Sequence, residues 1–250
     1  MMRIVNIVEN LFFNKPSFIL SLIFNFHYLP FKQAIRLPIL LYNPIFNRLR
    51  RGRGSIFSLK GKVIINSKNI SYGMIQLGPL LTTSHHNAGF IWANEGTVVF
   101  TGKAFLAQGC AIRNSGVLEF GHNVLMNANS KILCFYHIKI GNVVRISWDS
   151  LICDTNFHPL KKISTGEKNK PYAEVIIGDK VWIAQKTLVL AGTKIDESCI
   201  VSGGSIVTKR LSAAPYSIIA NSPSEVVSTG KYYRDFDDDG CQYEKYIYEE

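Results

Sequence analysis

An aliphatic side chain recurs at every sixth position over residues 177–207. The aliphatic members are Ile177, Ile183, Val189, Ile195, Val201 and Val207, and four residues after each of the first five comes a small or β-branched residue: Val181, Thr187, Thr193, Cys199 and Ser205. An amphipathic helix repeats its apolar positions every three or four residues and a half-buried strand every two, so neither produces a period of six. A chain that turns a corner every six residues does. Three such sides close one coil, and stacked coils form a parallel β-helix, which is the all-β fold that this period predicts.

The same period continues upstream in shorter sets. Apolar residues keep it over residues 100–112, 120–138 and 140–152, with phase shifts of two residues between the sets. These shifts predict coils of about twenty residues. Residues 57–75 are apolar without a clean period, and we interpret them as irregular first coils. With strands about 4.8 Å apart, roughly seven coils would form a prism about 30 Å long.

The pattern divides the chain into three regions. The β-helix domain is predicted to cover residues 55–210, with a loop at 153–174 where the period is interrupted. Residues 211–250 are predicted to form a C-terminal cap and an acidic tail, because Pro215 and Pro223 break the period. The last twenty residues carry three Lys/Arg, seven Asp/Glu and five tyrosines. This tail is expected either to dock on the body or to stay solvated.

Residues 1–54 form a separate apolar and basic extension. They carry eight Lys/Arg and one acidic residue, Glu9. Polar residues and prolines interrupt the apolar run before it reaches the about 20 residues of a membrane-spanning helix, and no signal-peptide cleavage site follows it. Short helices that pack on the first coils, or peripheral membrane contact through residues 1–53, are therefore expected. The arginines at the end suit anionic lipid or a phosphate-bearing substrate, and a solvated hinge is the alternative: Arg48, Arg50, Arg51 and Arg53.

The composition is that of one elongated domain with extensions. The chain has 250 residues, 47% of them hydrophobic, and a formal net charge of +10. Its five cysteines are scattered without a CxxC pair, so we expect no disulfide framework. A cytoplasmic protein is expected, with contact to the inner face of the cytoplasmic membrane as an extension of that hypothesis. No aromatic–basic nucleic-acid motif accompanies the positive charge, so nucleic acid is not an expected partner.

The loop at 153–174 contains the residues best suited to chemistry. His158 precedes Pro159, which biases the histidine towards extended backbone geometry. A neutral imidazole can accept a proton from a hydroxyl group. Asp154 and Asn156 are close enough in sequence to orient the ring, and four lysines make the loop basic, as suits an anionic partner. The alternative interpretation is a solvated histidine on a surface loop.

Five motifs follow one another between Ile140 and Val227: IGNVVRI, DTNFHP, IGDKVWIA, AGTKIDESCIVSGGSIVTK and ANSP. They resemble those of the hexapeptide-repeat (left-handed β-helix) acyltransferases, in particular the galactoside, maltose and xenobiotic acetyltransferases and their polysaccharide O-acetyltransferase relatives. The family pattern reads IGxxVxI, D-x-x-HP, IGxxVWIG, GxxIGxxxxIGAGSVVTK and A-G-x-P. The motifs cover about a third of the chain. They are specific for the superfamily and do not identify the acceptor.

The resemblance implies a homotrimeric, acetyl-CoA-dependent O-acetyltransferase that uses no metal. Acetyl-CoA would lie in the groove between neighbouring prisms, and the acceptor hydroxyl would attack the thioester directly. His158 occupies the position of the family's general base, with Asp154 expected to orient it. The implied cofactor-binding residues are Trp182, Ala184, Gln185, Gly203, Gly204, Thr208, Lys209 and Arg210, and the implied substrate-binding residues are Asn127, Asn129 and Asn156. A sugar hydroxyl in a surface polysaccharide or lipid-linked glycan, such as O-antigen, is the expected acceptor.

The chain also departs from the family pattern. Ala184 and Ser202 replace glycines, and Glu225 replaces a basic residue near the last proline turn. The basic residue is a CoA contact in the family, and Arg210 is expected to supply that contact instead. Three alternative functions stay open. They are a serine or small-molecule acetyltransferase of the same fold, a γ-carbonic-anhydrase-like zinc protein, and a non-catalytic hexapeptide scaffold. The zinc protein is disfavoured because no histidine pair has the short H-x4-H spacing of that family.

Overall fold

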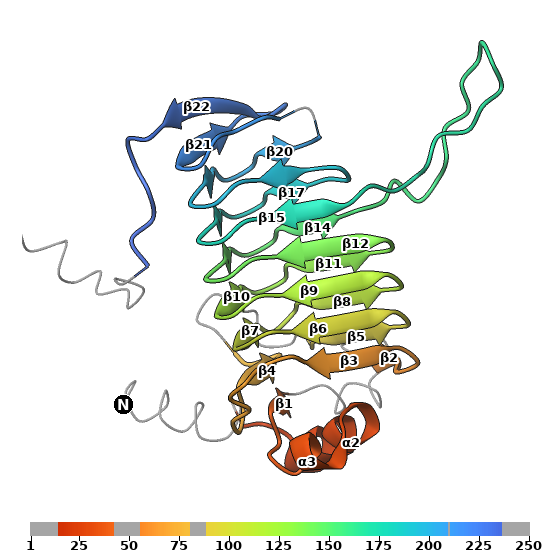
Figure 1. Cartoon of the computed structure of the whole chain (residues 1–250), viewed down its shortest axis with the longest axis vertical. Coiled ribbons are helices and arrows are strands. Elements are labelled where there is room, and N and C mark those ends of the chain that lie inside the picture. The colour runs from red at the N-terminus through yellow and green to blue at the C-terminus, as the bar shows by residue number, and fades with distance from the viewer. Residues whose placement is uncertain (1–14, 43–55, 81–88, 210, 237–250) are drawn as a thin grey trace, which may run out of the picture.

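The computed structural model describes residues 15–42, 56–80, 89–209 and 211–236, which wind through three sheets (Figure 1). Sheet 1 contains, in spatial order, β1 (Ile39–Leu41), β4 (Ile75–Leu77), β7 (Ala104–Leu106), β10 (Val124–Met126), β13 (Arg145–Ile146), β16 (Trp182–Ile183), β19 (Ile200–Val201), β21 (Ser217–Ala220) and β22 (Glu225–Thr229). Sheet 2 contains β2 (Ile56–Ser58), β5 (Ile91–Asn94), β8 (Ala111–Asn114), β11 (Lys131–Cys134), β14 (Leu151–Cys153), β17 (Leu188–Val189) and β20 (Ile206–Val207). Sheet 3 contains β3 (Lys62–Ile65), β6 (Thr97–Phe100), β9 (Val117–Phe120), β12 (His137–Ile140), β15 (Val175–Ile177) and β18 (Lys194–Ile195).

The coils advance by one strand of each sheet in turn, and all pairs except β21 with β22 are parallel. The predicted parallel β-helix is therefore confirmed. Ala104 pairs with Val124 and Trp182 pairs with Ile200, so the coils are twenty residues long in the middle and eighteen near the C-terminal end. We call the turn from sheet 1 into sheet 2 the first corner, the turn from sheet 2 into sheet 3 the second corner, and the return to sheet 1 the third corner.

The six-residue period fills the interior of the prism. All six aliphatic residues of the 177–207 set are at most 1% exposed. The small residues between them are also buried, and the hydroxyl groups of the two threonines bond to corner carbonyls. Thr187 donates to the Ala184 carbonyl at 2.8 Å and Thr193 to the Leu190 carbonyl at 2.6 Å. A small or β-branched residue fits inside the corner at each of these positions, and at the two threonines it also satisfies a buried acceptor.

Thiols can occupy the same small positions. Cys110 and Cys199 are fully buried there, as the period predicts. Burial raises the pKa of the Cys110 thiol to about 12, because an apolar interior disfavours the thiolate. The cysteines that the structure describes are all free and buried: Cys110, Cys134, Cys153 and Cys199.

Two short helices cover the N-terminal end of the prism (Figure 1). They are α2 (Phe18–Tyr28) and α3 (Phe31–Ala34). β1 lies within the segment predicted as an extension and pairs in parallel with β4, so sheet 1 of the β-helix takes in part of that segment. Within the described residues, no helix is both long and apolar enough to cross a membrane.

The opposite end closes with a strand of reversed direction. β21 continues sheet 1 in parallel beside β19, and β22 returns antiparallel to β21. The chain then runs back along sheet 1. The guanidinium of Arg234 lies 5.4 Å from the Trp182 ring, and the Tyr233 ring meets that of Tyr216 at 6.5 Å. The start of the acidic tail, residues 231–236, therefore docks on the body, and the rest of the tail lies outside the described residues.

Candidate active site

The loop between β14 and β15 leaves the second corner as a projecting arm (Figure 1). Its two ends are held together by backbone contacts. Ala173 donates to the Asp154 carbonyl at 2.9 Å, Asn156 donates to the Pro171 carbonyl at 2.7 Å, and Thr155 forms an antiparallel bridge with Tyr172. Residues 156–170 are all exposed. The arm is thus anchored at its base and extends away from its own prism.

His158 lies on the outward part of this arm. Its ring forms no hydrogen bond with any residue that the structure describes, while its backbone N–H donates to the Asn156 carbonyl at 2.7 Å. The preceding residue, Phe157, has a φ of +61°, a conformation that costs a non-glycine residue about 1–2 kcal/mol. Phe157 packs edge-on against Phe135 at 5.2 Å. The strained Phe157 therefore fixes where the backbone turns and leaves the His158 imidazole open to a substrate or a partner.

Asp154 does not contact the histidine that it was expected to orient. It is fully buried, and its two carboxylate oxygens each accept a backbone N–H at 2.8 Å, from Phe135 and Tyr136. The position belongs to a ladder inside the second corner, where Asn94, Asn114, Cys134 and Asp154 follow at intervals of one twenty-residue coil. Asp154 therefore anchors the base of the arm to the coil below it, and any influence on His158 is indirect.

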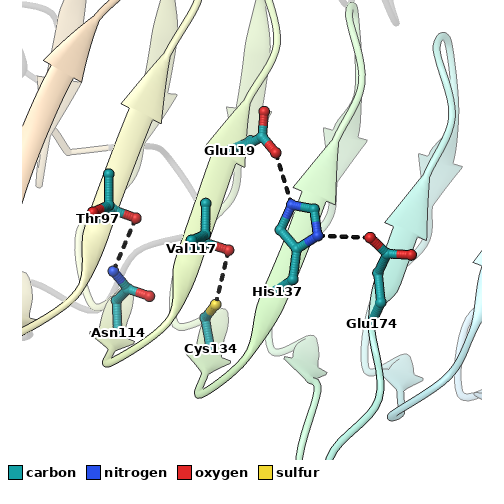
Figure 2. A network of polar contacts seen from close by, with 7 residues as sticks. All are labelled: Thr97, Asn114, Val117, Glu119, Cys134, His137 and Glu174. Atoms are coloured by element: carbon teal, nitrogen blue, oxygen red, sulfur yellow. Dashed lines mark hydrogen bonds and ion pairs between the residues drawn. The ribbon is translucent and has the colours of Figure 1, made fainter.

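Figure 2 shows two members of this ladder, Asn114 and Cys134, together with a second anchor on the outer surface of sheet 3. Asn114 donates to the Thr97 carbonyl at 3.1 Å and Cys134 to the Val117 carbonyl at 3.2 Å. His137 lies between two carboxylates of neighbouring coils. Its Nδ1 is hydrogen-bonded to Glu174 at 2.6 Å and its Nε2 to Glu119 at 2.7 Å. Glu174 is the last residue of the arm, so this hydrogen bond fixes the returning end of the arm to β12.

These anchors remove two neighbouring groups from consideration as the base or nucleophile. Both ring nitrogens of His137 are engaged by carboxylates, so neither can take a proton from a substrate. Cys153 is 4% exposed, donates to the Thr155 carbonyl at 3.0 Å, and has a pKa raised by burial. His158 is left as the exposed imidazole of the arm whose ring nitrogens no described residue engages.

A pocket of about 320 Å³ lies at the base of the arm. It brings together three residues predicted from the motifs, Asn156, Thr208 and Lys209, although 52 residues separate the first two in the sequence. Three further polar or aromatic residues line it that the motifs did not indicate: Asn169, Lys170 and Tyr172. The pairing of the two ends of the arm is the signal that would have placed them there. Leu190 and Ala191 form an apolar wall.

The remaining predicted residues gather at the first corner. Ala184 is buried, Gly203 and Gly204 are exposed, and an added Cβ on Gly203 would lie 3.0 Å from the Gln185 side chain. Asn127 and Asn129 belong to the same corner lower in the stack, and Trp182, on the strand that enters the corner, is half-buried and donates to the Ser147 hydroxyl at 3.1 Å. Arg234 covers the Trp182 ring, a contact that no sequence pattern signals.

The two groups lie at opposite edges of sheet 2. First-corner residues precede its strands and second-corner residues follow them, and because the strands are parallel these are two different edges. Gly203 and Thr208 flank β20, and at about 3.3 Å per residue they are roughly 16 Å apart. One chain therefore does not bring the predicted residues into a single cluster.

A second pocket, of about 500 Å³, opens on the outer face of sheet 2 below the arm. Ile91, Ala93 and Leu133 give it an apolar floor, and Arg113 stands at its side. The Arg113 guanidinium lies 5.8 Å from the centre of the Phe135 ring, and Phe135 in turn contacts Phe157. The pocket thus leads towards the base of the arm beside His158.

Some predicted features fall outside the described residues. These are Arg210 and the arginines at 48–53. Among the residues that are described, no three His, Cys, Asp or Glu side chains are grouped so that they could hold a metal ion.

Comparison with known proteins gives acetyltransferases. No protein-family model matches the chain. It is 29% identical over 110 residues to an assigned acetyltransferase of Schizosaccharomyces pombe, an alignment that covers 44% of this chain and 52% of the relative. It is 27% identical over 146 residues to WbbJ of Escherichia coli K12, assigned as an O-acetyl transferase of lipopolysaccharide biosynthesis, with coverage of 54% and 72%. The chain thus spans about half the length of the first relative.

Two of the solved structures that are similar to this one are acetyltransferases. The polySia-specific acetyltransferase NeuO has a TM-score of 0.47 and 17% identity, with 72% of this chain and 87% of that chain covered. Galactoside acetyltransferase in complex with coenzyme A has a TM-score of 0.35 and 22% identity, with 58% and 66% covered. The two sequence relatives carry the predicted enzyme class and confirm the resemblance that the motifs indicate.

Proposed function

We propose that the chain is an O-acyltransferase that moves an acetyl group from acetyl-CoA to a sugar hydroxyl, with His158 as general base. The observation that carries this proposal is the pocket at the base of the His158 arm. It joins residues from the HP motif and the TK motif, which are far apart in the sequence and have separate roles in the family that the chain resembles. The acetyltransferase names of the sequence relatives support the reaction class.

The reaction asks little covalent chemistry of the protein. The acceptor oxygen attacks the carbonyl carbon of the thioester while the imidazole of His158 takes the hydroxyl proton. The tetrahedral intermediate then collapses, the C–S bond breaks, and the same proton passes to the leaving thiolate of CoA. The thioester is already activated, so positioning and proton transfer supply the catalysis. The open His158 ring and its turn at Phe157 suit this role.

The pockets divide the two substrates between them. Lys170 and Lys209 have no ion-pair partner in the described part of the chain, and a lysine pair at a pocket mouth suits phosphate groups of CoA. Leu190 and Ala191 provide an apolar wall for the pantetheine arm. The sheet 2 pocket beside Arg113 is assigned to the acceptor, since it leads towards His158 from the other side.

A homotrimer would complete this site. The arm carries apolar side chains that its own prism does not cover, with Leu160 67% exposed and Ile163 fully exposed. The first-corner residues of the same chain lie at the far edge of sheet 2. In a three-fold assembly the arm of one chain can meet the first corner of its neighbour, so that each acyl-CoA site takes residues from two chains. The acceptor proposed here is a surface or lipid-linked glycan.

Replacement of His158 tests the proposal. In His158→Ala, turnover should fall by roughly 10²–10⁴-fold, the usual contribution of a positioned general base, while acetyl-CoA affinity stays near wild type. Turnover is followed by CoA thiol release with sugar and glycan acceptors, and affinity by calorimetry. His122→Ala is the matched control, because His122 is exposed at the third corner away from both pockets. Turnover of His158→Ala within a few-fold of the control would overturn the assignment, and loss of acetyl-CoA binding would make His158 a binding residue instead.

A further inference from the structure

The helix α2 is attached to the prism by one apolar side chain, Phe24, whose ring meets that of Trp92 at 5.4 Å, and by two polar ones. Ser21 and Asn25 are fully buried against the first strand of sheet 1. The Asn25 amide donates to the Ile39 carbonyl at 2.7 Å and accepts the Ile39 N–H at 3.2 Å, while the Ser21 hydroxyl accepts the Leu41 N–H at 2.9 Å. These side chains satisfy backbone groups along the exposed edge of β1, so they hold α2 firmly and close the sheet edge.

The outward face of the same helix is apolar. Its exposed side chains are Phe18 (59%), Ile19 (68%), Leu22 (38%), Ile23 (57%) and Phe26 (44%). The surface continues onto the next turn of the chain, where Phe31 is 69% and Ile35 is 54% exposed, and the Phe26 and Phe31 rings meet at 5.9 Å. We call these seven residues the end-cap surface. The helices that carry it lie at the N-terminal end of the prism (Figure 1).

This arrangement reverses the usual amphipathic helix. A helix on a water-soluble protein turns its apolar stripe to the core and its polar face to solvent. Here two of the three buried residues, Ser21 and Asn25, are polar and only Phe24 is apolar, while five of the exposed positions are large and apolar. Contiguous apolar surfaces of this kind mark sites that meet another apolar phase.

The charge around the end-cap surface indicates which apolar phase it meets. Residues 15–42 contain three basic residues, Lys15, Lys32 and Arg36, and no acidic one. Lys32 and Arg36 lie in or just after α3 and are exposed. An apolar face bordered by cations is complementary to a bilayer that carries anionic headgroups. A contact with a second copy would instead place these like charges together.

We propose that the end-cap surface docks on an anionic lipid bilayer and holds the prism by its N-terminal end. The eleven-residue α2 lies in the interface with Phe and Ile side chains among the acyl chains and the basic residues at the headgroups. The His158 arm leaves sheet 2 after β14, four strands above β2. At about 4.8 Å per coil, the arm is roughly 19 Å farther from the membrane than the first coil. A lipid-carried glycan would present its sugars at that side of the bilayer.

Vesicle binding by the full chain tests this inference independently of its activity. The wild type should cosediment with vesicles of phosphatidylcholine and phosphatidylglycerol. Ile19→Ser together with Ile23→Ser should lower the partition coefficient by roughly 100-fold, because two side chains no longer leave water. Lys32→Gln should lower it by about fivefold on the anionic vesicles and leave binding to pure phosphatidylcholine unchanged.

The control is a double change of equal chemistry away from the end cap. Val117 is 39% and Val227 is 52% exposed, on β9 and β22, and Val117→Ser with Val227→Ser should leave vesicle binding unchanged. A wild type that fails to bind anionic vesicles, or two double variants that lose binding equally, would overturn the proposal. A change in oligomer mass in the Ile19/Ile23 variant, with no vesicle binding by the wild type, would make the end-cap surface a contact between copies of the chain.

Discussion

The two edges of sheet 2 come from the same coils and present opposite kinds of surface. At the first corner the described coils turn through a residue of positive φ. Gly203 and Gly204 carry no side chain and are exposed, so the backbone is accessible there. The second corner carries the projecting arm, the lysines of its pocket and the His158 ring. One edge is suited to close approach by a substrate and the other to proton transfer and charge recognition. In the proposed enzyme these two tasks meet only where neighbouring chains do.

Mixed assemblies would test this division most strongly. His158→Ala disables the second corner, and Gly204→Leu should block the first, because an added Cβ on Gly204 has no atom within 4 Å and points into open space. Each variant alone should have little activity. Coexpressed in equal amounts, they should recover about one quarter of wild-type turnover, because random assortment gives one site in four with both edges intact.

Gly204→Ala is the control for backbone strain in that experiment. Non-glycine residues hold the same positive φ lower in the column, namely Asn129, Asp149 and Lys186, so the alanine variant should fold and keep most of its activity. No recovery in the coexpressed assemblies, with each parent folded and trimeric, would mean that both edges serve one site within a single chain.

The buried ladder at the second corner should have the next largest effect. Asp154→Ala leaves two backbone N–H groups, of Phe135 and Tyr136, without the carboxylate that they now contact at 2.8 Å. The free energy of unfolding should fall by about 3 kcal/mol, as expected for two donors left without a partner. Asp154→Asn should lose less, since Asn94 and Asn114 occupy the same ladder position. Thermal melts measure both, and equal melting temperatures for Asp154→Ala and wild type would contradict the anchoring role.

The sequence predicted the prism better than it predicted the site, for a physical reason. The interior is set by local periodicity, because each buried aliphatic residue faces the next coil in the same way, and residues such as Ile183 and Val201 lie where the period places them. The second corner depends on contacts between coils. Asp154 was taken for a partner of His158 because the two are four residues apart, but its twenty-residue spacing from Cys134 assigns it to the ladder.

The irregular ends were predicted least well. The tail contact of Arg234 with Trp182 and the edge contact of Asn25 with Ile39 join segments that no repeat relates. Hydrophobic richness in the N-terminal segment indicated helices near the first coils. It did not indicate that α2 would place Ser21 and Asn25 beside Phe24 on the face towards the prism, where the helix contacts a sheet edge that needs hydrogen-bond partners as well as apolar cover.

The thiol at the first corner provides a prediction of intermediate size. Burial raises the pKa of Cys110 from 9.0 to about 12. The pKa of the thiol is higher in the folded state than in the unfolded chain. The contribution of the neutral buried thiol to the free energy of unfolding is therefore fully present below pH 9 and is lost as pH rises towards 12. Between these limits the stability of the wild type should fall by about 1.4 kcal/mol per pH unit more than that of Cys110→Ala, in which other titrations are unchanged. Urea unfolding at a series of alkaline pH values measures the difference, and parallel pH profiles would contradict it.

The smallest expected effect is at the pocket of the second corner, where Lys209 contributes charge rather than a fitted contact. Its side chain is exposed, so Lys209→Gln should raise the KM for acetyl-CoA by about fivefold, leave kcat near wild type, and weaken the salt dependence of KM. Lys103→Gln is the matched control, because Lys103 is an exposed lysine at the third corner, away from both edges of sheet 2. The comparison with dephospho-CoA sharpens the result: if Lys209 meets the terminal phosphate, the variant and the wild type should bind that analogue equally. A fall in kcat at unchanged KM would instead assign Lys209 to the reacting end of the cofactor, and equal KM values for both lysine variants would remove the phosphate from this pocket.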